Sequence, residues 1–487
     1  MKKKFYITTT LPYVNAEPHI GFAMEIVYAD IMARYRRELG DDVFFNTGTD
    51  EHGLKIYRKA IDEGKDPQAY VDEYAEKFKK LKEALNLSDD LHFIRTTDAH
   101  HKKAAQEFWK LCEKNGDIYK DTYKTKYCVG CELEKTDSEL VDGKCPIHPN
   151  LEVEIIEEEN YFFRFSKYQK PLLGLYEKNP EFVLPESRLK EINNFVEAGL
   201  EDFSISRLKE KMPWGIPVPG DEKHVMYVWF DALINYISTL GWPENAAKFD
   251  EFWGTKEAPN GIQFAGKDQV RQQAAMWQAM LMSANLPNSK QIVIHGFVTS
   301  NGQKMSKSLG NVVNPYEVIE KYGTDAFRYY IARELNMFDD SDFTWEKFEE
   351  SYNANLANGL GNFASRVLTL AVRYDKLPQP KLENVVSGNL TKTRQLINQY
   401  LSEFKFREAM EKIWDVISFG DAYINLKKPW EKGDHQNTVS ELVIILLNIG
   451  EFLRPFLPDT SEKIIECIKL NDSDIDVKRI KNLFPRK

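Results

Sequence analysis

The sequence predicts an α/β domain built around a parallel sheet, followed by an all-α helical bundle. Near the start, a strand-like run at 5–10 precedes a helical stretch from Ile20 to about Leu39 and a second strand-like run at 43–45. Strand, helix and strand at this spacing are typical of a βαβ unit in a parallel sheet. From about residue 350 the strand-like patterning stops and amphipathic helical periodicity replaces it.

The α/β part is expected to be interrupted by an insertion. We predict its first half at 1–115, the insertion at 116–215, its second half at 216–300 and a connector at 301–345. The second half contains strand-like runs at 225–230 and 262–266, a helix at 268–284 and an apolar run at 292–297. The bundle is predicted at 346–487, with amphipathic helices at 351–374, 390–404, 406–427, 437–454 and 459–469.

The composition describes an ordinary globular protein. The chain has 487 residues, of which 42% are hydrophobic and 29% charged, enough for several domains with a sizeable core. A formal net charge of −10 does not indicate a nucleic-acid binder, although Lys and Arg clustered on one face would still permit RNA binding. We see no signal peptide, and the apolar run at 442–447 is too short to cross a membrane, so we expect a cytoplasmic protein.

Three of the five cysteines lie near a histidine at a spacing typical of metal ligands. Cys128-x-x-Cys131 is followed, after thirteen residues, by Cys145-x-x-His148. Two ligand pairs of this kind, each on a tight turn, fit a closed tetrahedral site that holds one structural Zn²⁺. The alternative interpretation is a coincidence of free cysteines.

Two further motifs indicate the binding of a nucleotide polyphosphate. Pro18-His19-Ile20-Gly21 opens the first helix, whose N-terminus offers free N–H groups and a positive dipole end to an anion. The second motif is a glycine-flanked loop with two lysines, Lys304-Met305-Ser306-Lys307-Ser308. Either motif alone could be structural, as a helix cap or a solvated basic loop. Together, in this order, they are far more specific.

With these motifs the chain resembles class I aminoacyl-tRNA synthetases, and among them the methionyl-tRNA synthetase family, over essentially its whole length. Further markers of the resemblance are the stretches at 11–13, 47–53, 227–232, 266–268, 362–366 and 429–430. The resemblance implies a Rossmann-like catalytic domain with a zinc-knuckle insertion, followed by a helical-bundle anticodon-binding domain. It also implies the activity of a methionine–tRNA ligase. ATP would activate L-methionine as methionyl-adenylate, and the methionyl group would pass to tRNA(Met), initiator tRNA included.

The resemblance implies roles for individual residues. The expected catalytic residues are His19, Gly21, Lys304 and Lys307. ATP, accompanied by Mg²⁺, would contact these four and also Met305, Ser306 and Ser308. The expected methionine-binding residues are Leu11, Tyr13, Asp50, Trp229, Ala232 and Tyr236, with Asp50 pairing with the α-ammonium group. The expected anticodon-binding residues are Asn362, Arg366 and Trp430. Without the resemblance, Trp229 and Tyr236 would also fit a plain core, and Asn362 and Arg366 a helix surface.

The chain departs from the family pattern at three positions. Phe22 stands where the first motif normally ends in a second histidine, so one ATP contact is lost or supplied elsewhere. Gln269 and Gln273 stand where the family commonly has an apolar residue and a histidine that line the methionine pocket.

The insertion looks too small for an editing domain, so methionine would be selected mainly at the synthetic site. The chain ends shortly after the bundle, which favours a monomer.

Three other functions compete with this interpretation. A class I synthetase for another amino acid would keep both ATP motifs, but the cysteine spacing and the 227–232 stretch oppose it. A nucleotidyltransferase outside translation would have no use for the predicted anticodon-type bundle. A catalytically silent paralogue would be supported by Phe22 and opposed by His19 and the intact lysine loop.

Overall fold

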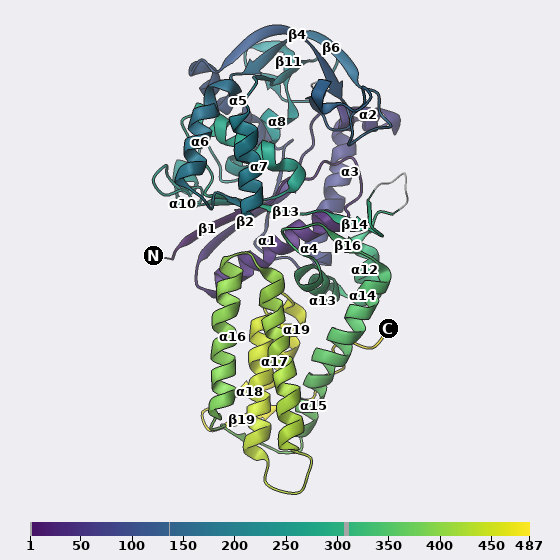
Figure 1. Cartoon of the computed structure of the whole chain (residues 1–487), viewed down its shortest axis with the longest axis vertical. Helices are drawn as coiled ribbons and strands as arrows, with labels where there is room; N and C mark the ends of the chain where they lie inside the picture. The colour runs from purple at the N-terminus through teal and green to yellow at the C-terminus, as the bar shows by residue number, and fades with distance from the viewer. Residues whose placement is uncertain (1, 136, 306–310) are drawn as a thin grey trace. The chain divides into compact units, whose positions relative to one another are not determined.

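The computed structural model describes residues 2–135, 137–305 and 311–487, which form two compact units (Figure 1). The first, here the sheet unit, contains the chain up to Pro18 together with Gly40–Lys80 and Asp89–His295. The second, here the helical unit, contains His19–Leu39, Leu81–Ser88 and Gly296–Lys487. Each unit is therefore assembled from segments that lie far apart in the sequence.

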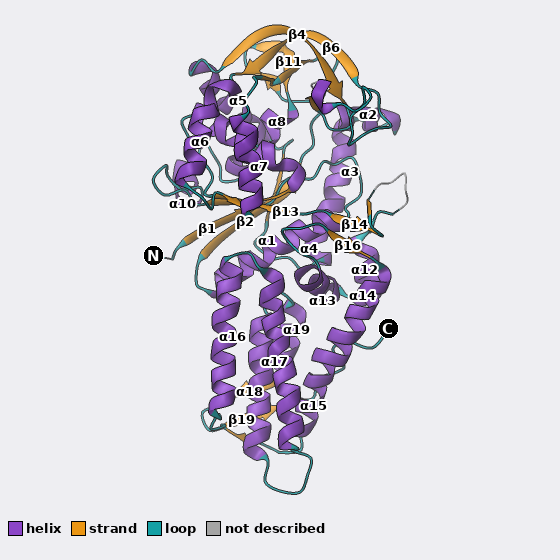
Figure 2. Cartoon of the chain, in the orientation of Figure 1, coloured by secondary structure: helices purple, strands orange, loops and turns teal. Residues whose placement is uncertain are grey.

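A six-stranded parallel sheet is the centre of the sheet unit (Figures 1 and 2). Its strand order is β3-β2-β1-β12-β13-β7, and each neighbouring pair is parallel. The strands are β1 (Lys4–Thr8), β2 (Asp42–Thr49), β3 (His92–Arg95), β7 (Val183–Leu184), β12 (Gly261–Gly266) and β13 (Gln291–His295). The strands predicted from the runs at 5–10, 43–45, 262–266 and 292–297 are confirmed.

The strand order reverses between β1 and β12. From β1 the chain adds β2 and β3 on one side, whereas β12 and β13 extend the sheet on the other side. In open α/β sheets, ligands bind outside the carboxyl ends of the strands at such a reversal. The segments that follow β1 and β2 carry Leu11, Tyr13 and Asp50, so these residues lie at the end of the sheet where a ligand is expected.

The segment predicted as an insertion holds a four-stranded antiparallel sheet, ordered β5-β4-β6-β8. Its strands are β4 (Ile118–Cys128), β5 (Leu133–Lys135), β6 (Glu154–Phe163) and β8 (Phe203–Ser204). A three-stranded sheet follows, made by β9 (Ser206–Leu208), β10 (Pro217–Val218) and β11 (Asp221–Met226). The segment at 116–215 also contributes to the main sheet, because β7 pairs with β13.

Helices cover these sheets and bury an aromatic core. They are α2 (Leu54–Asp62), α3 (Pro67–Lys79), α5 (Ala99–Lys114), α6 (Gln169–Lys178), α7 (Glu186–Glu197), α8 (Val228–Ala232), α9 (Asn235–Ser238), α10 (Ala246–Phe252) and α11 (Trp277–Ser283). Phe108 on α5 shows how tightly the core is packed, since its ring centroid lies 5.7–5.9 Å from those of Phe230, Trp242 and Trp277.

The helix predicted at 268–284 is not a regular α-helix throughout. A 3₁₀ turn at Lys267–Gln269 and a π-helical segment at Gln272–Met276 precede α11. Periodicity alone does not distinguish these forms. π-Helical segments occur frequently at functional sites, and this one carries Gln273.

In the helical unit, α1 (Ile20–Glu38) confirms the first predicted helix. The unit also contains α4 (Leu81–Ala84), α12 (Pro315–Tyr322), α13 (Thr324–Tyr329) and a small sheet of β14 (Val298–Ser300), β15 (Gln303–Lys304) and β16 (Ser341–Phe343). A fully buried ion pair of 2.8 Å between Asp30 and Arg328 joins α1 to α13. Arg328 also donates to three main-chain carbonyl groups, so neither charge is left unsatisfied.

The bundle comprises α14 (Trp345–Ser351), α15 (Asn362–Ala371), α16 (Asn384–Ser402), α17 (Phe406–Lys427), α18 (Gln436–Leu453) and α19 (Pro458–Glu466), as Figure 2 shows. The helix predicted at 406–427 is confirmed residue for residue. The stretch predicted as one helix at 351–374 contains a π-helical segment at Tyr352–Gly361. The prediction that strands stop near 350 was wrong for β17 (Leu377–Pro378), β18 (Ile468–Leu470) and β19 (Asp474–Val477), because strands this short carry no alternating pattern.

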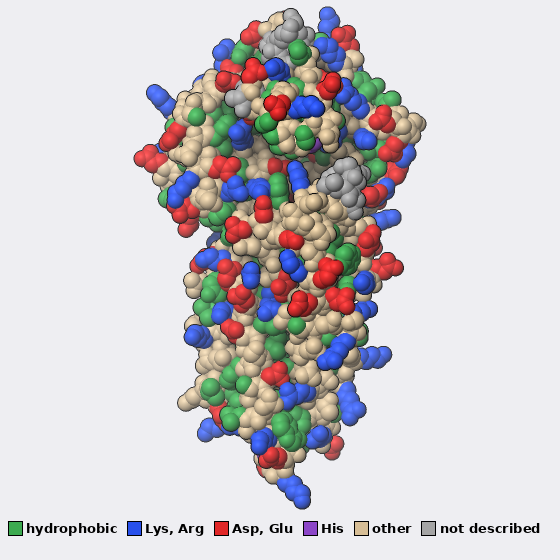
Figure 3. Space-filling model, turned by 45° about the vertical axis from the view of Figure 1, so that its right-hand side comes forward, with side chains coloured by type: hydrophobic (Ala, Val, Ile, Leu, Met, Phe, Trp, Pro, Cys, Tyr) green, Lys and Arg blue, Asp and Glu red, His purple; other side chains and the backbone are tan. Residues whose placement is uncertain are grey.

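Charged side chains of both signs are scattered over one face of the molecule (Figure 3). On the face in Figure 3, Lys and Arg side chains are interspersed with Asp and Glu. None of the helices among the described residues has the length and apolar character needed to cross a membrane.

Candidate active site and metal centre

The segments after β1 and β2 run side by side and present Tyr13 and Asp50. The two residues form a parallel bridge, closed by main-chain hydrogen bonds of 3.0 and 3.2 Å between the segments. Trp229 and Ala232 on α8 belong to a small apolar cluster that includes Tyr13 and is separate from the main core. The structure therefore brings together most of the residues predicted to bind methionine. Leu11, two residues before Tyr13 in the chain, is half-buried.

Asp50 has an unsatisfied polar atom. Its Oδ1 is buried and has no hydrogen-bond partner among the described residues, and the same holds for Nε1 of Trp229. Burial raises the pKa of the Asp50 carboxyl well above its usual value, and the negative charges of Asp231 and Glu132 raise it further. A buried polar group without a partner costs about 1–3 kcal/mol. A cationic ligand group at Oδ1 would remove this cost.

Two histidines, His52 and His101, hold the buried carboxylate of Asp231 on α8. Asp231 Oδ2 lies 2.6 Å from His52 Nδ1, and Asp231 Oδ1 lies 2.8 Å from His101 Nε2. The other ring nitrogen of His101 bonds the Ser238 hydroxyl at 2.8 Å. Burial alone would raise the pKa of Asp231, but the two histidines outweigh this effect and hold it at about 2. Asp231 is therefore ionised, although sequence reasoning assigned no role to it or to His101.

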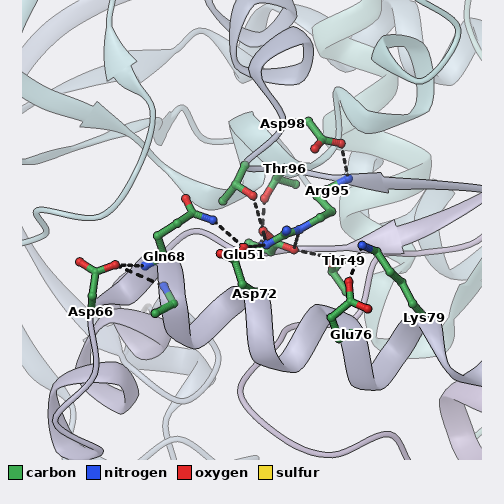
Figure 4. Close-up of polar contacts among 12 residues, drawn as sticks. Thr49, Glu51, Asp66, Gln68, Asp72, Glu76, Lys79, Arg95, Thr96 and Asp98 are labelled. Atoms are coloured by element: carbon green, nitrogen blue, oxygen red, sulfur yellow. Dashed lines mark hydrogen bonds and ion pairs between the residues drawn. The ribbon is translucent and has the colours of Figure 1, made fainter.

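A second network fixes the loop that contains Asp50 and His52 (Figure 4). Between them in the chain, the fully buried Glu51 accepts two hydrogen bonds from Arg95, of 2.7 and 2.9 Å. Arg95 also donates to Asp72 at 2.6 Å. The Thr49 hydroxyl donates to the Glu51 carboxylate at 2.6 Å, and the Thr96 hydroxyl accepts a bond of 2.9 Å from the Glu51 N–H. These residues come from β2, β3 and α3, and no short-range sequence pattern connects them.

The two glutamines that replace the expected pocket residues, Gln273 and Gln269, differ in burial. Gln273 is buried, and its Nε2 donates to the Tyr236 hydroxyl at 2.7 Å. Its Oε1 accepts a bond of 3.1 Å from Gln263, whose own oxygen accepts from the Ser289 hydroxyl. The polar amide of Gln273 is therefore satisfied and touches a predicted methionine-binding residue. Gln269 is half-buried.

The first motif forms the start of α1 in the helical unit. His19 is the N-cap residue, and its Nδ1 accepts a hydrogen bond of 3.1 Å from the Gly21 N–H. A Cβ atom at Gly21 would lie 3.1 Å from the imidazole ring, so a side chain there would press on it. The capping bond uses only Nδ1, and the His19 side chain is exposed. His19 can therefore cap the helix and contact a ligand through Nε2.

The chain just beyond the second motif contacts the start of α1. Lys304 is exposed on β15, with its Nζ 5.7 Å from the centre of the Phe297 ring. Asn311 donates to the Lys304 carbonyl at 3.3 Å and so closes the base of the loop. Just beyond, the Val313 carbonyl accepts a bond of 3.0 Å from the Ile20 N–H at the start of α1. Met305 is described, whereas Ser306, Lys307 and Ser308 lie outside the described residues.

The predicted metal ligands gather at the end of β4. The ligand atoms of Cys128, Cys131, Cys145 and His148 all lie within 4.8 Å of one another, and three of their separations are 3.2, 3.5 and 3.8 Å. Zn–S and Zn–N bonds of about 2.3 and 2.0 Å give tetrahedral edges of roughly 3.5–3.8 Å. A Cβ at Gly130 would lie 2.5 Å from the His148 ring, so only glycine fits there. This cluster can hold a metal ion.

The predicted anticodon residues lie on the bundle. Asn362 and Arg366 are one turn apart on α15. Arg366 donates to Asp421 at 2.7 Å and to Asn425 at 2.8 Å, both on α17. Trp430 follows the end of α17 and is 49% exposed, a large fraction for an aromatic side chain.

Comparison with known proteins gives concordant matches. The family described as class I tRNA synthetases (M) matches residues 5–152 and 150–368, and the anticodon-binding domain of tRNA ligase matches residues 384–480. The methionine–tRNA ligase of Thermotoga maritima is 41% identical over 485 residues, which cover 96% of this chain and 76% of that protein. The chain belongs to the methionine–tRNA ligase family. The family member from Brucella suis is 40% identical, covering 96% of this chain and 92% of its own length.

Solved structures of this family agree with the fold. Mycobacterium tuberculosis methionyl-tRNA synthetase in complex with methionyl-adenylate superposes with a TM-score of 0.93 at 34% identity, covering 99% of this chain and 100% of that one. The apo form of the same protein gives 0.86 at 30% identity, covering 100% and 99%. The predicted family, fold class and methionine–tRNA ligase activity are confirmed. The matches do not support a synthetase for another amino acid or a nucleotidyltransferase outside translation.

Proposed function

We propose that this methionine–tRNA ligase works in two steps that need no covalent enzyme intermediate. The methionine carboxylate attacks the α-phosphorus of ATP, which gives methionyl-adenylate and releases pyrophosphate. A ribose hydroxyl of the terminal adenosine of tRNA(Met) then attacks the methionyl carbonyl, and AMP leaves. The observation that supports the amino-acid site most directly is the unpaired, buried Oδ1 of Asp50. Catalysis comes from positioning and from charge placed where it develops in the transition state.

Methionine binds to the cluster around Tyr13 in this proposal. Its α-ammonium group pairs with Asp50, and its side chain packs on Leu11, Trp229 and Ala232. Each contact between a sulfur atom and an aromatic ring contributes about 0.3–1.5 kcal/mol. Tyr236 lies in the main core, where the amide of Gln273 donates to its hydroxyl, and in this proposal it lines the pocket from that side. A polar residue at position 273 thus serves the pocket through Tyr236.

ATP, with Mg²⁺ as its counter-ion, binds at the two motifs of the helical unit. His19 and the main chain at Gly21 contact it at the start of α1. Lys304 and Lys307 hold the pyrophosphate, together with Met305, Ser306 and Ser308. The hydrogen bond between Ile20 and Val313 supports this proposal, because it ties the start of α1 to the chain beyond the lysine loop. Loss of one such donor costs about 2.7–4 kcal/mol of transition-state stabilisation.

The four-residue cluster holds Zn²⁺ in a structural role. Three thiolates and an imidazole, with separations close to tetrahedral edges, are a donor set suited to zinc. When bound, the ion contributes folding free energy to the segment that holds it. Cys128, Cys131, Cys145 and His148 fill all four positions, so the site leaves no open position for substrate.

The bundle reads the anticodon of tRNA(Met), including that of the initiator tRNA. Asn362 and Arg366 bond base edges, and Asp421 and Asn425 hold Arg366 in place for this role. Trp430 stacks on an unpaired base, a contact of about 1–3 kcal/mol. The use of tRNA(Met) as substrate supports a cytoplasmic location. The prediction of a monomer is tested by light scattering in solution.

ATP–pyrophosphate exchange across the twenty amino acids tests the first step, with wild type compared with Lys307→Ala. We expect exchange with methionine alone and its near-complete loss in the variant. Exchange with another amino acid would mean that the glutamines have changed the specificity. No exchange with any of the twenty, in folded and metal-loaded protein, would overturn the proposal in favour of a silent paralogue.

A further inference from the structure

Glu132 lies between the metal cluster and the amino-acid site. It directly follows the predicted ligand Cys131 and is only 5% exposed. Its φ of 49° is in the left-handed region, which a residue with a long side chain rarely adopts. A buried carboxylate and a left-handed main chain are both unfavourable by themselves. Their combination in one residue indicates that the surrounding contacts hold it there, as happens at functional positions.

The two carboxylate oxygens of Glu132 reach two different elements. Oε1 accepts a hydrogen bond of 2.9 Å from the Lys55 N–H in the first turn of α2. Oε2 lies 2.5 Å from the Tyr13 hydroxyl, which also lies 2.6 Å from the His52 carbonyl oxygen. Glu132 therefore contacts both the start of α2 and a residue predicted to bind methionine.

The start of α2 has to be capped by a side chain from elsewhere in the chain. The N-cap of α2 is Gly53, which has no side chain to satisfy the first N–H groups of the helix. A Cβ there would lie 2.0 Å from the Tyr13 hydroxyl and 2.9 Å from Glu132 Oε2, so no larger residue fits. Glu132 supplies the cap instead. In addition, the Lys55 ammonium group donates to the Gly130 carbonyl at 3.4 Å, a second link to the metal cluster.

We propose that Glu132 is a positioning residue that links the metal cluster to the methionine site by holding the Tyr13 ring and the start of α2. Glu132 itself does not touch substrate. It acts through Tyr13, whose hydroxyl it holds near His52, the residue two positions beyond Asp50. The inference rests on the proposed function, because it assumes that Tyr13 contacts methionine.

A matched control residue lies in the same region. Glu154 on β6 pairs with Arg58 on α2 at 3.1 Å, and both side chains are more than 40% exposed. This pair also joins the metal-bearing sheet to α2, but it touches neither Tyr13 nor the start of the helix. Glu154→Ala therefore controls for the loss of a carboxylate that joins these two elements without contacting Tyr13.

The test compares Glu132→Ala, Glu132→Gln, Tyr13→Phe and the double variant Tyr13→Phe/Glu132→Ala with wild type and Glu154→Ala. The measurements are metal content, the Kd of methionine by calorimetry without ATP, and KM and kcat in pyrophosphate exchange. We expect Glu132→Ala to keep its metal and its ATP KM while its methionine Kd and KM rise about tenfold. Glu132→Gln should recover part of this loss, because its amide oxygen can still accept from Lys55. Glu154→Ala should match wild type.

The double variant separates positioning through Tyr13 from an independent effect. If Glu132 acts through Tyr13, the double variant is no worse than the more affected single variant. Additive losses, or an unchanged methionine Kd in metal-loaded Glu132→Ala, would overturn the inference. If Glu132→Ala loses its metal, the same cycle made with Glu132→Gln decides. A wild type without methionine-dependent exchange would instead refute the proposed function.

Discussion

The buried carboxyl of Asp50 is expected to lower stability in order to bind substrate. Its pKa in the folded protein is well above the ordinary value near 4, because of burial first and then the charges of Asp231 and Glu132. As pH rises from about 4 towards the folded pKa, the unfolded chain gives up this proton while the folded protein keeps it, so stability falls with rising pH. Asp50→Asn, which cannot ionise, should therefore melt at a higher temperature than wild type at pH 7.

The same substitution should abolish methionine binding. Thermal unfolding of both proteins between pH 5 and pH 8, with and without methionine, checks the two effects together. Methionine should raise the melting temperature of wild type only, because the variant offers no charge to the α-ammonium group. An Asn variant that melts lower than wild type at pH 7, or that is still stabilised by methionine, would contradict this account of Asp50.

The amide of Gln273 cannot titrate, unlike the histidine common at this position in the family. We therefore expect position 273 to add no pH dependence to the methionine KM between pH 5.5 and 8.5. Gln273→His should introduce such a dependence below the ordinary histidine pKa of about 6.5, because the ring gains a charge as pH falls and burial at this position disfavours that charge. Pyrophosphate exchange across this range, with saturating ATP, measures it. Equal pH profiles for the two proteins would place residue 273 outside the methionine site.

At the scale of elements, the contacts of Arg95 join β3 to the loop after β2 and to α3 (Figure 4). Arg95→Ala would leave the fully buried Glu51 without its cation, and breaking a buried pair in this way costs about 3–5 kcal/mol. We expect urea unfolding to show a loss of this size and the methionine KM to rise, because Asp50 and His52 flank Glu51.

A nearby exposed pair gives the control for Arg95. Lys79 bonds Glu76 at 2.6 Å one turn away on α3, and both side chains are at least 40% exposed. Lys79→Ala should change the free energy of unfolding by less than about 1 kcal/mol. Similar losses for the two variants would show that the Arg95 network does not hold the loop.

The turn that carries the metal ligands depends on Gly130. Gly130→Ala would place a methyl group 2.5 Å from the His148 ring and displace one ligand. We expect weaker metal binding, measured by competition with a chromogenic chelator. Gly174→Ala, in α6 with open space at its Cβ position, is the matched control and should retain the metal. Equal retention by both variants would mean that His148 is not a ligand.

At the scale of the whole molecule, local patterns predicted the elements better than the contacts between them. The structure contains β1, α1 and β2 in the predicted order, the helix at 406–427, and the predicted cluster of three cysteines and a histidine. Each of these features depends on residues close in sequence. By contrast, Glu132 meets Tyr13, and His101 meets Asp231, across more than a hundred residues. No periodicity encodes such pairs, because only the completed sheet brings their segments together. The π-helical segments were missed because they share the periodic apolar pattern of α-helices.

The position of Trp430 on the bundle, far along the chain from both ATP motifs, leads to a last prediction, about which step the bundle serves. Pyrophosphate exchange needs only methionine and ATP, whereas aminoacylation also needs tRNA. Trp430→Ala should leave exchange unchanged and lower kcat/KM for tRNA(Met) by roughly 5- to 150-fold, which corresponds to the loss of one stacked base at about 1–3 kcal/mol. Leu470→Ala removes another exposed apolar side chain of the helical unit, on β18, and should affect neither reaction. An effect of Trp430→Ala on exchange would show that the bundle also supports the adenylation site. Unchanged values in both assays would remove Trp430 from the anticodon interface.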